Sequence, residues 1–132
     1  MINSILIANR GEIACRIIRT AKKLGIKSYV IYSTEDENSL AVKLADKAFL
    51  LKSNCSEKKE YLDGEQIISI AQKNKIEAIH PGYGFLSENS NFAKLVEDNG
   101  IKFIGPPYKA IEIMGDKIIS KKHAKNIAVS TI

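Results

Sequence analysis

The chain has 132 residues, of which 45% are hydrophobic and 27% charged, as in one globular domain with a real core. No apolar run approaches the roughly 20 residues that span a bilayer, and the N-terminus lacks the basic start of a signal peptide. Two cysteines make neither a disulfide framework nor a zinc spacing, so we expect a cytoplasmic protein. The net charge of +5 comes from dispersed lysines without stacking aromatics, so neither nucleic acid nor a membrane is an expected partner.

Apolar runs typical of strands alternate along the chain with amphipathic helical patterns. We expect strands at 4–8, 28–32, 48–51, 76–79 and 101–104, with helices at 12–24, from 40, from 63 and at 92–96. Gly25 ends the first helix, and Asp63 with Gln66 resembles a capping box. The alternation predicts an α/β fold: a Rossmann-like, mostly parallel sheet of about five strands with helices on both faces. The loops after the first, fourth and fifth strands should then share one edge.

Two short helical stretches, 109–114 and 117–125, are expected after the fifth strand, with Asp116 as the N-cap of the second. Residues 129–132 have strand-like side chains but no closing element, so we expect the chain to be part of a longer protein.

The turn after the first strand lacks the glycines of a dinucleotide-binding site. That motif needs three glycines, whereas residues 9–14 contain only Gly11. Glu12 would also place a negative charge where the diphosphate should lie. NAD or FAD binding is therefore not expected, and Arg10 and Glu12 are either exposed turn residues or an ion pair that fixes the turn.

Arg16 and Arg19 lie three residues apart and therefore share one face of the first helix. We place this face opposite the apolar stripe that contains Ile13 and Ile17. A solvated surface is the simple interpretation, and a subunit contact is the alternative because arginine is enriched at interfaces.

The most unusual segment is residues 80–89, His-Pro-Gly-Tyr-Gly-Phe-Leu-Ser-Glu-Asn, directly after the fourth strand. Functional groups gather on such loops, and a loop built only to turn the chain would not need a His, a Tyr and a Glu. Tyr83 stands between two glycines that leave room for a ligand. His80 can be an ordinary core-edge histidine, and Glu88 can cap the next helix. The apolar residues of the segment, Phe85 and Leu86, are expected in the core.

Lys117 is expected at the start of a helix, where a positive charge is unfavourable for the helix dipole. This conflict favours a role as a point charge for an anionic ligand.

Four segments, in this order and at this spacing, resemble the biotin carboxylase component of biotin-dependent carboxylases. They are 7–14 (Ile-Ala-Asn-Arg-Gly-Glu-Ile-Ala), 80–89, 103–106 (Phe-Ile-Gly-Pro) and 114–117 (Met-Gly-Asp-Lys). The resemblance covers essentially the whole chain. Cys15-Arg16 and residues 115–121 look most like the α subunits of propionyl-CoA or methylcrotonyl-CoA carboxylase.

The resemblance implies that residues 1–115 are the N-terminal, pre-ATP-grasp domain and that residues 116–132 begin a truncated ATP-grasp region. The parent enzyme would be a ligase that uses ATP, bicarbonate and Mg²⁺ or Mn²⁺ to carboxylate biotin, the first half-reaction of acyl-CoA carboxylation. Its partners would be the ATP-grasp remainder, a biotin carboxyl carrier domain, a carboxyltransferase subunit and a second copy in a homodimer.

Residue by residue, the resemblance implies that Lys117 contacts ATP. It implies that Tyr83 and Gly84 form a wall of the biotin and bicarbonate pocket, with Glu88 supporting that loop. The loop-shaping residues are His80, Pro81 and Gly82, and the expected dimer contacts are Arg16 and Arg19.

The family's metal-binding carboxylates, phosphate-binding loop and bicarbonate arginine would follow Ile132, so no catalytic and no metal-binding residue is expected within the chain. We therefore predict that the chain alone is inactive. The alternative functions are a stand-alone nucleotide-binding module and a dimerisation module.

Overall fold

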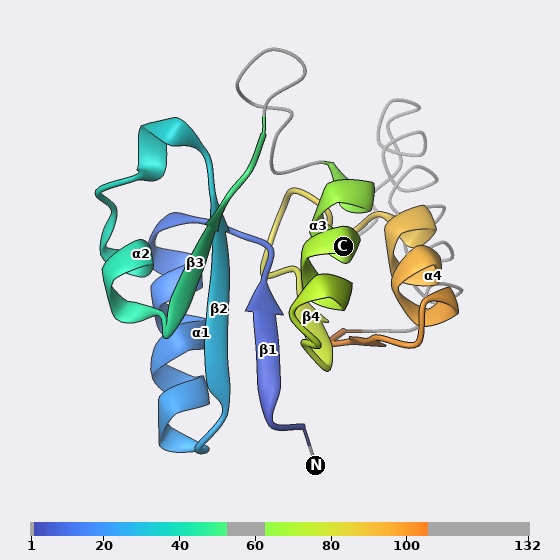
Figure 1. The fold of residues 1–132 in the computed structure, drawn as a ribbon, viewed down its shortest axis with the longest axis horizontal. Coiled ribbons are helices and arrows are strands. Elements are labelled where there is room, and N and C mark those ends of the chain that lie inside the picture. The colour runs from blue at the N-terminus through green and yellow to red at the C-terminus, as the bar shows by residue number, and fades with distance from the viewer. Residues whose placement is uncertain (1, 53–62, 106–132) are drawn as a thin grey trace, which may run out of the picture.

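The alternating pattern produces a five-stranded parallel sheet in the computed structural model of the chain (Figure 1). The structure describes residues 2–52 and 63–105. The strands are β1 (Ser4–Ile7), β2 (Lys27–Tyr32), β3 (Lys47–Leu50), β4 (Ala78–His80) and β5 (Lys102–Phe103). The helices are α1 (Gly11–Lys23), α2 (Leu40–Leu44), α3 (Gly64–Lys73) and α4 (Ser90–Asp98), with a short 3₁₀ turn, η1 (Thr34–Asp36). The spatial order β3-β2-β1-β4-β5, with every pair parallel, confirms the predicted fold class.

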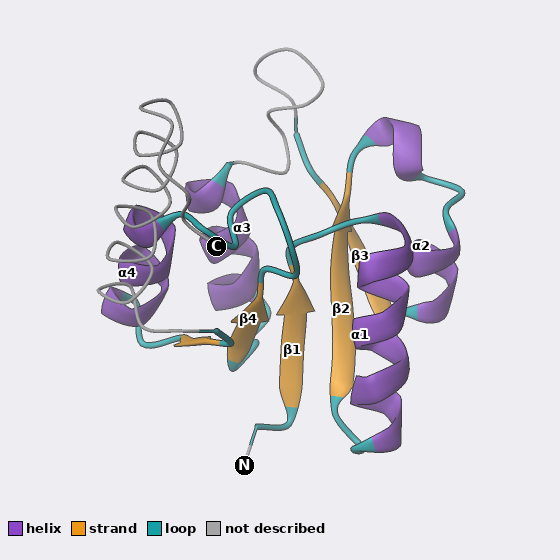
Figure 2. Cartoon of the chain, turned by 180° about the vertical axis from the view of Figure 1, so that it is seen from behind, coloured by secondary structure: helices purple, strands orange, loops and turns teal. Residues whose placement is uncertain are grey.

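The strand order decides which helices cover each face of the sheet. The chain moves outward from β1 to β3 and then returns to β4 and β5 on the other side of β1. Right-handed crossovers therefore place α1 and α2 on one face and α3 and α4 on the other. Figures 1 and 2 show the two faces, with α1 and α2 nearer the viewer in Figure 2.

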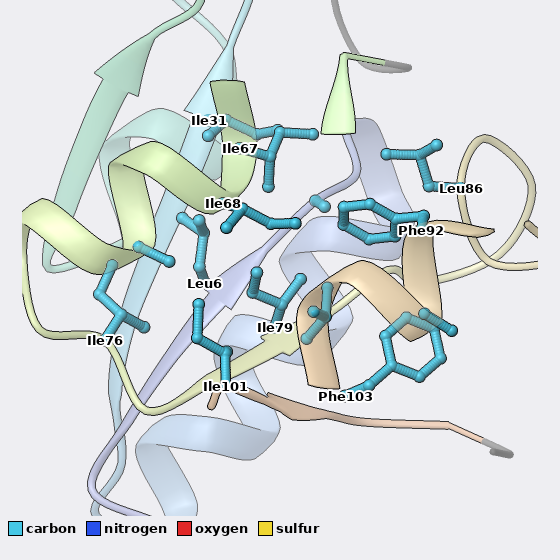
Figure 3. Close-up of a cluster of buried hydrophobic side chains, with 14 of the residues drawn as sticks. Leu6, Ile31, Ile67, Ile68, Ile76, Ile79, Leu86, Phe92, Ile101 and Phe103 are labelled. Atoms are coloured by element: carbon cyan, nitrogen blue, oxygen red, sulfur yellow. The ribbon is translucent and has the colours of Figure 1, made fainter. Parts of the chain in front are cut away.

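Among the described residues, three apolar clusters pack against the sheet, and the two largest lie on its opposite faces, because successive strand residues point to opposite faces. Leu6 joins the larger core with Ile79 and Phe92 beneath α3 and α4 (Figure 3). Ile7, its neighbour in β1, joins the smaller core beneath α1. Phe92 also meets Phe103 edge-on, with ring centroids 6.2 Å apart, which fixes α4 against β5.

Side-chain caps set where three of the helices begin. The Asp63 side chain accepts a hydrogen bond from Gln66 N at 3.2 Å, which confirms the predicted cap of α3. Ser39 accepts from Val42 N at the start of α2. Asn89 Oδ1 accepts from Phe92 N at 3.0 Å, so Asn89 caps α4, and the suggestion that Glu88 does so is wrong.

Two details around the predicted loop 80–89 also differ. β4 ends at His80, so this residue closes the strand instead of opening the loop. Leu86 is buried as expected, but the prediction for Phe85 is wrong because its side chain is 39% exposed. Phe85 has a left-handed backbone, with φ 47°, which turns the chain so that the next residue enters the core.

Candidate functional site

The loops after β1 and β4 meet at the carboxyl-terminal edge of the sheet. The parallel pairing sets Ile7 opposite His80, and Ala8 N donates to the His80 carbonyl at 2.9 Å. The next residues, Asn9 and Pro81, are therefore neighbours although they are far apart in sequence. This arrangement confirms the prediction that these two loops share one edge.

Asn9 is the polar residue that joins the two loops. Its side chain is only 1% exposed, and its Nδ2 donates to the carbonyl oxygens of Pro81 at 2.8 Å and Tyr83 at 2.7 Å. Its Oδ1 accepts from Arg10 N at 2.8 Å. Every polar atom of the amide is thus bonded, as burial requires. The sequence pattern places Asn9 in a turn and predicts no further role for it; its position directly after the predicted strand 4–8 is the one available signal.

Two glycines allow the loop to pass close to Asn9. Gly82 and Gly84 have φ of 68° and 69°, values that residues with a Cβ rarely adopt. A Cβ on Gly82 would lie 2.5 Å from Asn9 Nδ2, whereas a Cβ on Gly84 would meet nothing within 4 Å. Gly82 is therefore required by both conformation and space, and Gly84 by conformation alone.

His80 supports the same turn from the strand side. Its Nδ1 accepts a hydrogen bond from Gly82 N at 3.0 Å. Burial lowers the pKa of the imidazole, and the accepted bond requires an unprotonated Nδ1, so the ring is neutral with its proton on Nε2. The predicted loop-shaping residues, His80, Pro81 and Gly82, thus lie together in one hydrogen-bonded turn.

Tyr83 leaves this turn with its side chain 75% exposed. Tyr83 and His80 line one end of an open groove of about 390 Å³ that runs along α1. Other residues of the groove include Ile5, Ile13, Arg16, Ile17, Leu24 and Ile104. Gly84 and Glu88 are exposed on the same loop but do not line the groove.

The groove overturns the predicted orientation of α1. The stripe that packs on the sheet consists of small or branched residues: Ala14, Cys15, Ile18 and Ala21. Ile13 and Ile17 are only half-buried and lie beside Arg16 in the groove, so the prediction that Arg16 faces away from them is wrong. Arg19 is turned away from the groove and pairs with Glu12 at 3.5 Å. Close packing of a helix on a parallel sheet favours the stripe with alanines over the bulkier one.

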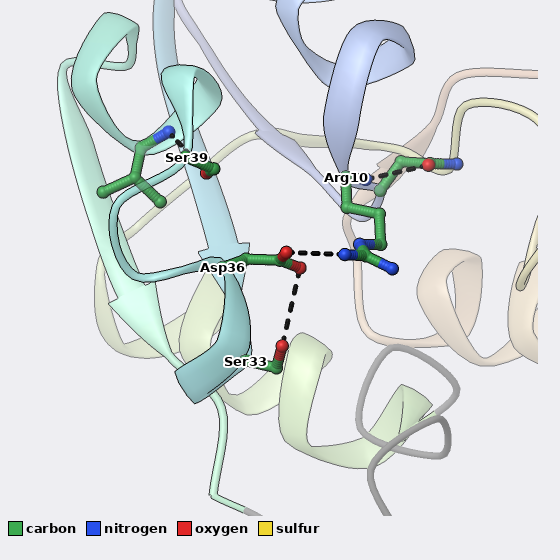
Figure 4. Close-up of polar contacts among 6 residues, drawn as sticks. Arg10, Ser33, Asp36 and Ser39 are labelled. Atoms are coloured by element: carbon green, nitrogen blue, oxygen red, sulfur yellow. Dashed lines mark hydrogen bonds and ion pairs between the residues drawn. The ribbon is translucent and has the colours of Figure 1, made fainter.

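Arg10 makes a different ion pair from the one suggested by the sequence. Its Nη2 lies 2.6 Å from Asp36 Oδ1, in η1, and Asp36 also accepts a hydrogen bond from Ser33 Oγ at 3.5 Å (Figure 4). An Arg10–Glu12 pair is therefore wrong, since Glu12 pairs with Arg19. The contact nevertheless fixes the turn, by joining it to the segment after β2.

Lys117, with its predicted ATP contact, lies outside the described residues, as do both helical stretches expected after Gly105. Within 2–52 and 63–105, no group of three His, Cys, Asp or Glu side chains is arranged to hold a metal ion. In that part of the chain, no helix is long and apolar enough to cross a membrane.

Comparison with known proteins gives consistent matches over the whole chain. Residues 1–111 match the family described as the biotin carboxylase N-terminal domain. The chain is 53% identical over 131 residues to the mitochondrial methylcrotonoyl-CoA carboxylase subunit alpha of Dictyostelium discoideum. It is 49% identical over 132 residues to the propionyl-CoA carboxylase alpha chain of Ruegeria pomeroyi. These matches cover 99% and 100% of this chain but 19% of each relative, so the chain spans about a fifth of their length.

Solved structures agree with the sequence matches. A crystal structure of the biotin carboxylase domain dimer of the Hydrogenobacter thermophilus 2-oxoglutarate carboxylase, in complex with MgADP, ADP and bicarbonate, superposes with a TM-score of 0.87 at 48% identity. The match covers 100% of this chain and 29% of that one.

Proposed function

This chain belongs to the biotin carboxylase N-terminal domain family, and we propose that its protein carboxylates biotin with ATP and bicarbonate. The observation that carries the proposal is the match of the whole chain to a domain crystallised with MgADP and bicarbonate. The reaction would be the first half-reaction of an acyl-CoA carboxylase, because the matched relatives include methylcrotonoyl-CoA and propionyl-CoA carboxylase subunits. Residues 1–115 would form the N-terminal domain, and residues 116–132 would begin the ATP-grasp region.

In this proposal the loop after β4 is one wall of the pocket for biotin and bicarbonate. Tyr83 would present its exposed phenol, and Gly84 would leave an open approach because no atom fills the space of its missing Cβ. Glu88 would support the loop. Lys117 would contact ATP, and Mg²⁺ or Mn²⁺ bound with ATP would neutralise phosphate charge.

In the proposed enzyme, this chain is necessary for catalysis but not sufficient without the ATP-grasp remainder. Its described residues position a loop, and they contain no cluster that could hold the metal. We therefore propose that the chain alone has no carboxylase activity. Its partners would be the ATP-grasp remainder, a biotin carboxyl carrier domain and a carboxyltransferase subunit. A cytoplasmic location stays part of the proposal, although the Dictyostelium relative is named as mitochondrial.

Self-association is a second proposed role, supported by the groove along α1. The groove is lined by Arg16 and, further along α1, by Leu24, which is 61% exposed. An arginine at the edge of an apolar surface is typical of protein interfaces. The Hydrogenobacter relative was crystallised as a domain dimer. Arg19 does not line the groove, so Arg16 is the better candidate for the contact.

A chimera tests the proposed function. Residues 1–132 of this chain would replace the aligned segment of the Hydrogenobacter biotin carboxylase domain, with which they share 48% identity. We expect the chimera to cleave ATP in a reaction that requires bicarbonate and is stimulated by free biotin. The 132-residue chain at the same concentration should show no such activity. A folded but inactive chimera, or an active isolated chain, would contradict the proposal.

A further inference from the structure

We propose that Asn9 is a positioning residue for the carboxylation of biotin: it holds the backbone of 81–83 so that Tyr83 and Gly84 face the biotin and bicarbonate pocket. The inference rests on the proposed function of the loop. Asn9 does not contact the pocket itself, because its side chain is 1% exposed and lies beneath the turn. Its effect on the reaction would pass through the loop.

The hydrogen bonds of Asn9 fix both its own orientation and that of the loop. Its Oδ1 accepts from Arg10 N, which leaves Nδ2 directed at the carbonyls of Pro81 and Tyr83. A flipped amide would set its oxygen against two carbonyl oxygens and its NH₂ against an N–H donor, so only one orientation satisfies all partners. The two bonds join residues 72 and 74 positions apart in sequence.

The loop needs this support because one of its residues, Phe85, adopts a strained backbone conformation. Gly82, Gly84 and Phe85 all have positive φ within four consecutive residues. For Phe85 a left-handed backbone is unfavourable, and such conformations persist only where surrounding contacts hold them. Asn9 Nδ2 supplies two of these contacts on the Tyr83 side of the turn. Without them, we expect Tyr83 to leave its position before Leu86, which stays anchored in the core.

The Asn9→Asp variant isolates the proposed contribution. Aspartate has the same shape and keeps an acceptor for Arg10 N, but it replaces the donor to the two carbonyls with an oxygen. Asn99→Asp is the matched control. Asn99 Nδ2 also donates to a backbone carbonyl, that of Leu95 at 2.7 Å, but at the exposed end of α4. Both variants lose a side-chain amide donor to the backbone, and only one does so beneath the loop.

The readout is the change in the KM for free biotin compared with the change in the KM for ATP, both measured in the chimera. We expect Asn9→Asp to raise the KM for free biotin at least tenfold while the KM for ATP changes less than twofold. Asn99→Asp should change neither constant more than twofold. A purely structural role would lower the melting temperature and leave the KM for biotin unchanged, and that result would overturn the proposal. An equal rise in both constants would also overturn it.

Amide hydrogen exchange of the 132-residue chain gives a second readout that does not depend on activity. Gly82 N–H donates to His80 Nδ1, so loosening of the loop should speed its exchange at least tenfold in Asn9→Asp and not in Asn99→Asp. Unchanged exchange at Gly82 would overturn the proposal. If the Asn9→Asp chimera does not fold, the Asn9→Ser chimera, whose hydroxyl is a shorter donor, is measured in its place. A raised KM for biotin is again the expected result, and an unchanged KM for biotin would overturn the proposal.

The two proposals fail in different ways. An inactive chimera without any substitution would reject the proposed function, whatever the exchange at Gly82 shows. An active chimera in which Asn9→Asp keeps its KM for biotin would reject only the role of Asn9.

Discussion

The guanidinium of Arg10 lies 2.6 Å from Asp36 Oδ1 and ties the loop after β1 to the turn after β2. Arg10 N also donates to Asn9 Oδ1, and Asn9 Nδ2 donates to the carbonyls of Pro81 and Tyr83. The loop after β1 is therefore held on one side by Asp36 and on the other by the turn after β4. Arg10 is half-exposed and Asp36 is 12% exposed. The Glu12–Arg19 pair is longer, at 3.5 Å, and more exposed on both sides. The two pairs therefore offer a matched comparison of a joining contact and a surface contact.

Arg10→Gln should lower the free energy of unfolding by about 1 kcal/mol, the upper end for a partly exposed ion pair. Arg19→Gln should change it by less than about 0.3 kcal/mol, because its pair is more solvated. Urea denaturation of the two variants measures the difference, and added salt should reduce it by screening. Equal effects of the two substitutions would show that the Arg10–Asp36 contact adds no more than a surface pair.

Gly82→Ala should destabilise the chain by about 3 kcal/mol, from a left-handed backbone and a clash with Asn9. Gly84→Ala has nearly the same φ but open space around the added Cβ, so it should cost about 1 kcal/mol. The difference between the two losses of stability isolates the contact of Gly82 with Asn9. Thermal or urea unfolding measures it, and similar losses in both variants would argue against close packing of Gly82 on the amide.

His80 should make the chain less stable in mild acid. Folding lowers the pKa of its imidazole from 6.5, so the unfolded chain takes up the proton first as the pH falls. The stability that depends on neutral His80 is complete above this value and is lost as the pH falls from about 6.5 towards the lower pKa of the folded state. In the His123→Gln variant, His80 is the one remaining histidine, and its ring signals in NMR should titrate below 6.5. A midpoint at or above this value would contradict the prediction.

Arg16→Glu should weaken self-association more than Arg19→Glu. Arg16 lines the apolar groove along α1, whereas Arg19 lies outside it. We expect Arg16→Glu to raise the dimer dissociation constant of the chimera at least tenfold, about 1.4 kcal/mol, with Arg19→Glu as the matched charge reversal. Sedimentation measures both. Unchanged association in Arg16→Glu would remove the groove as the proposed interface.

The sequence by itself determined the fold class, most element positions and the family. Strand and helix periodicities are local patterns, as are caps such as Asp63 with Gln66. They can therefore be recognised before the tertiary structure is known. The ordered motifs of the resemblance are linear too, and the family match over residues 1–111, with relatives matched along the whole chain, confirmed the family. Strand order and register decided the rest. They placed Asn9 beneath Pro81 and Tyr83 and brought Arg10 next to Asp36. They also placed Arg16 in the wall of a groove. Each of these contacts depends on which segments the sheet brings together, and no local pattern records that pairing.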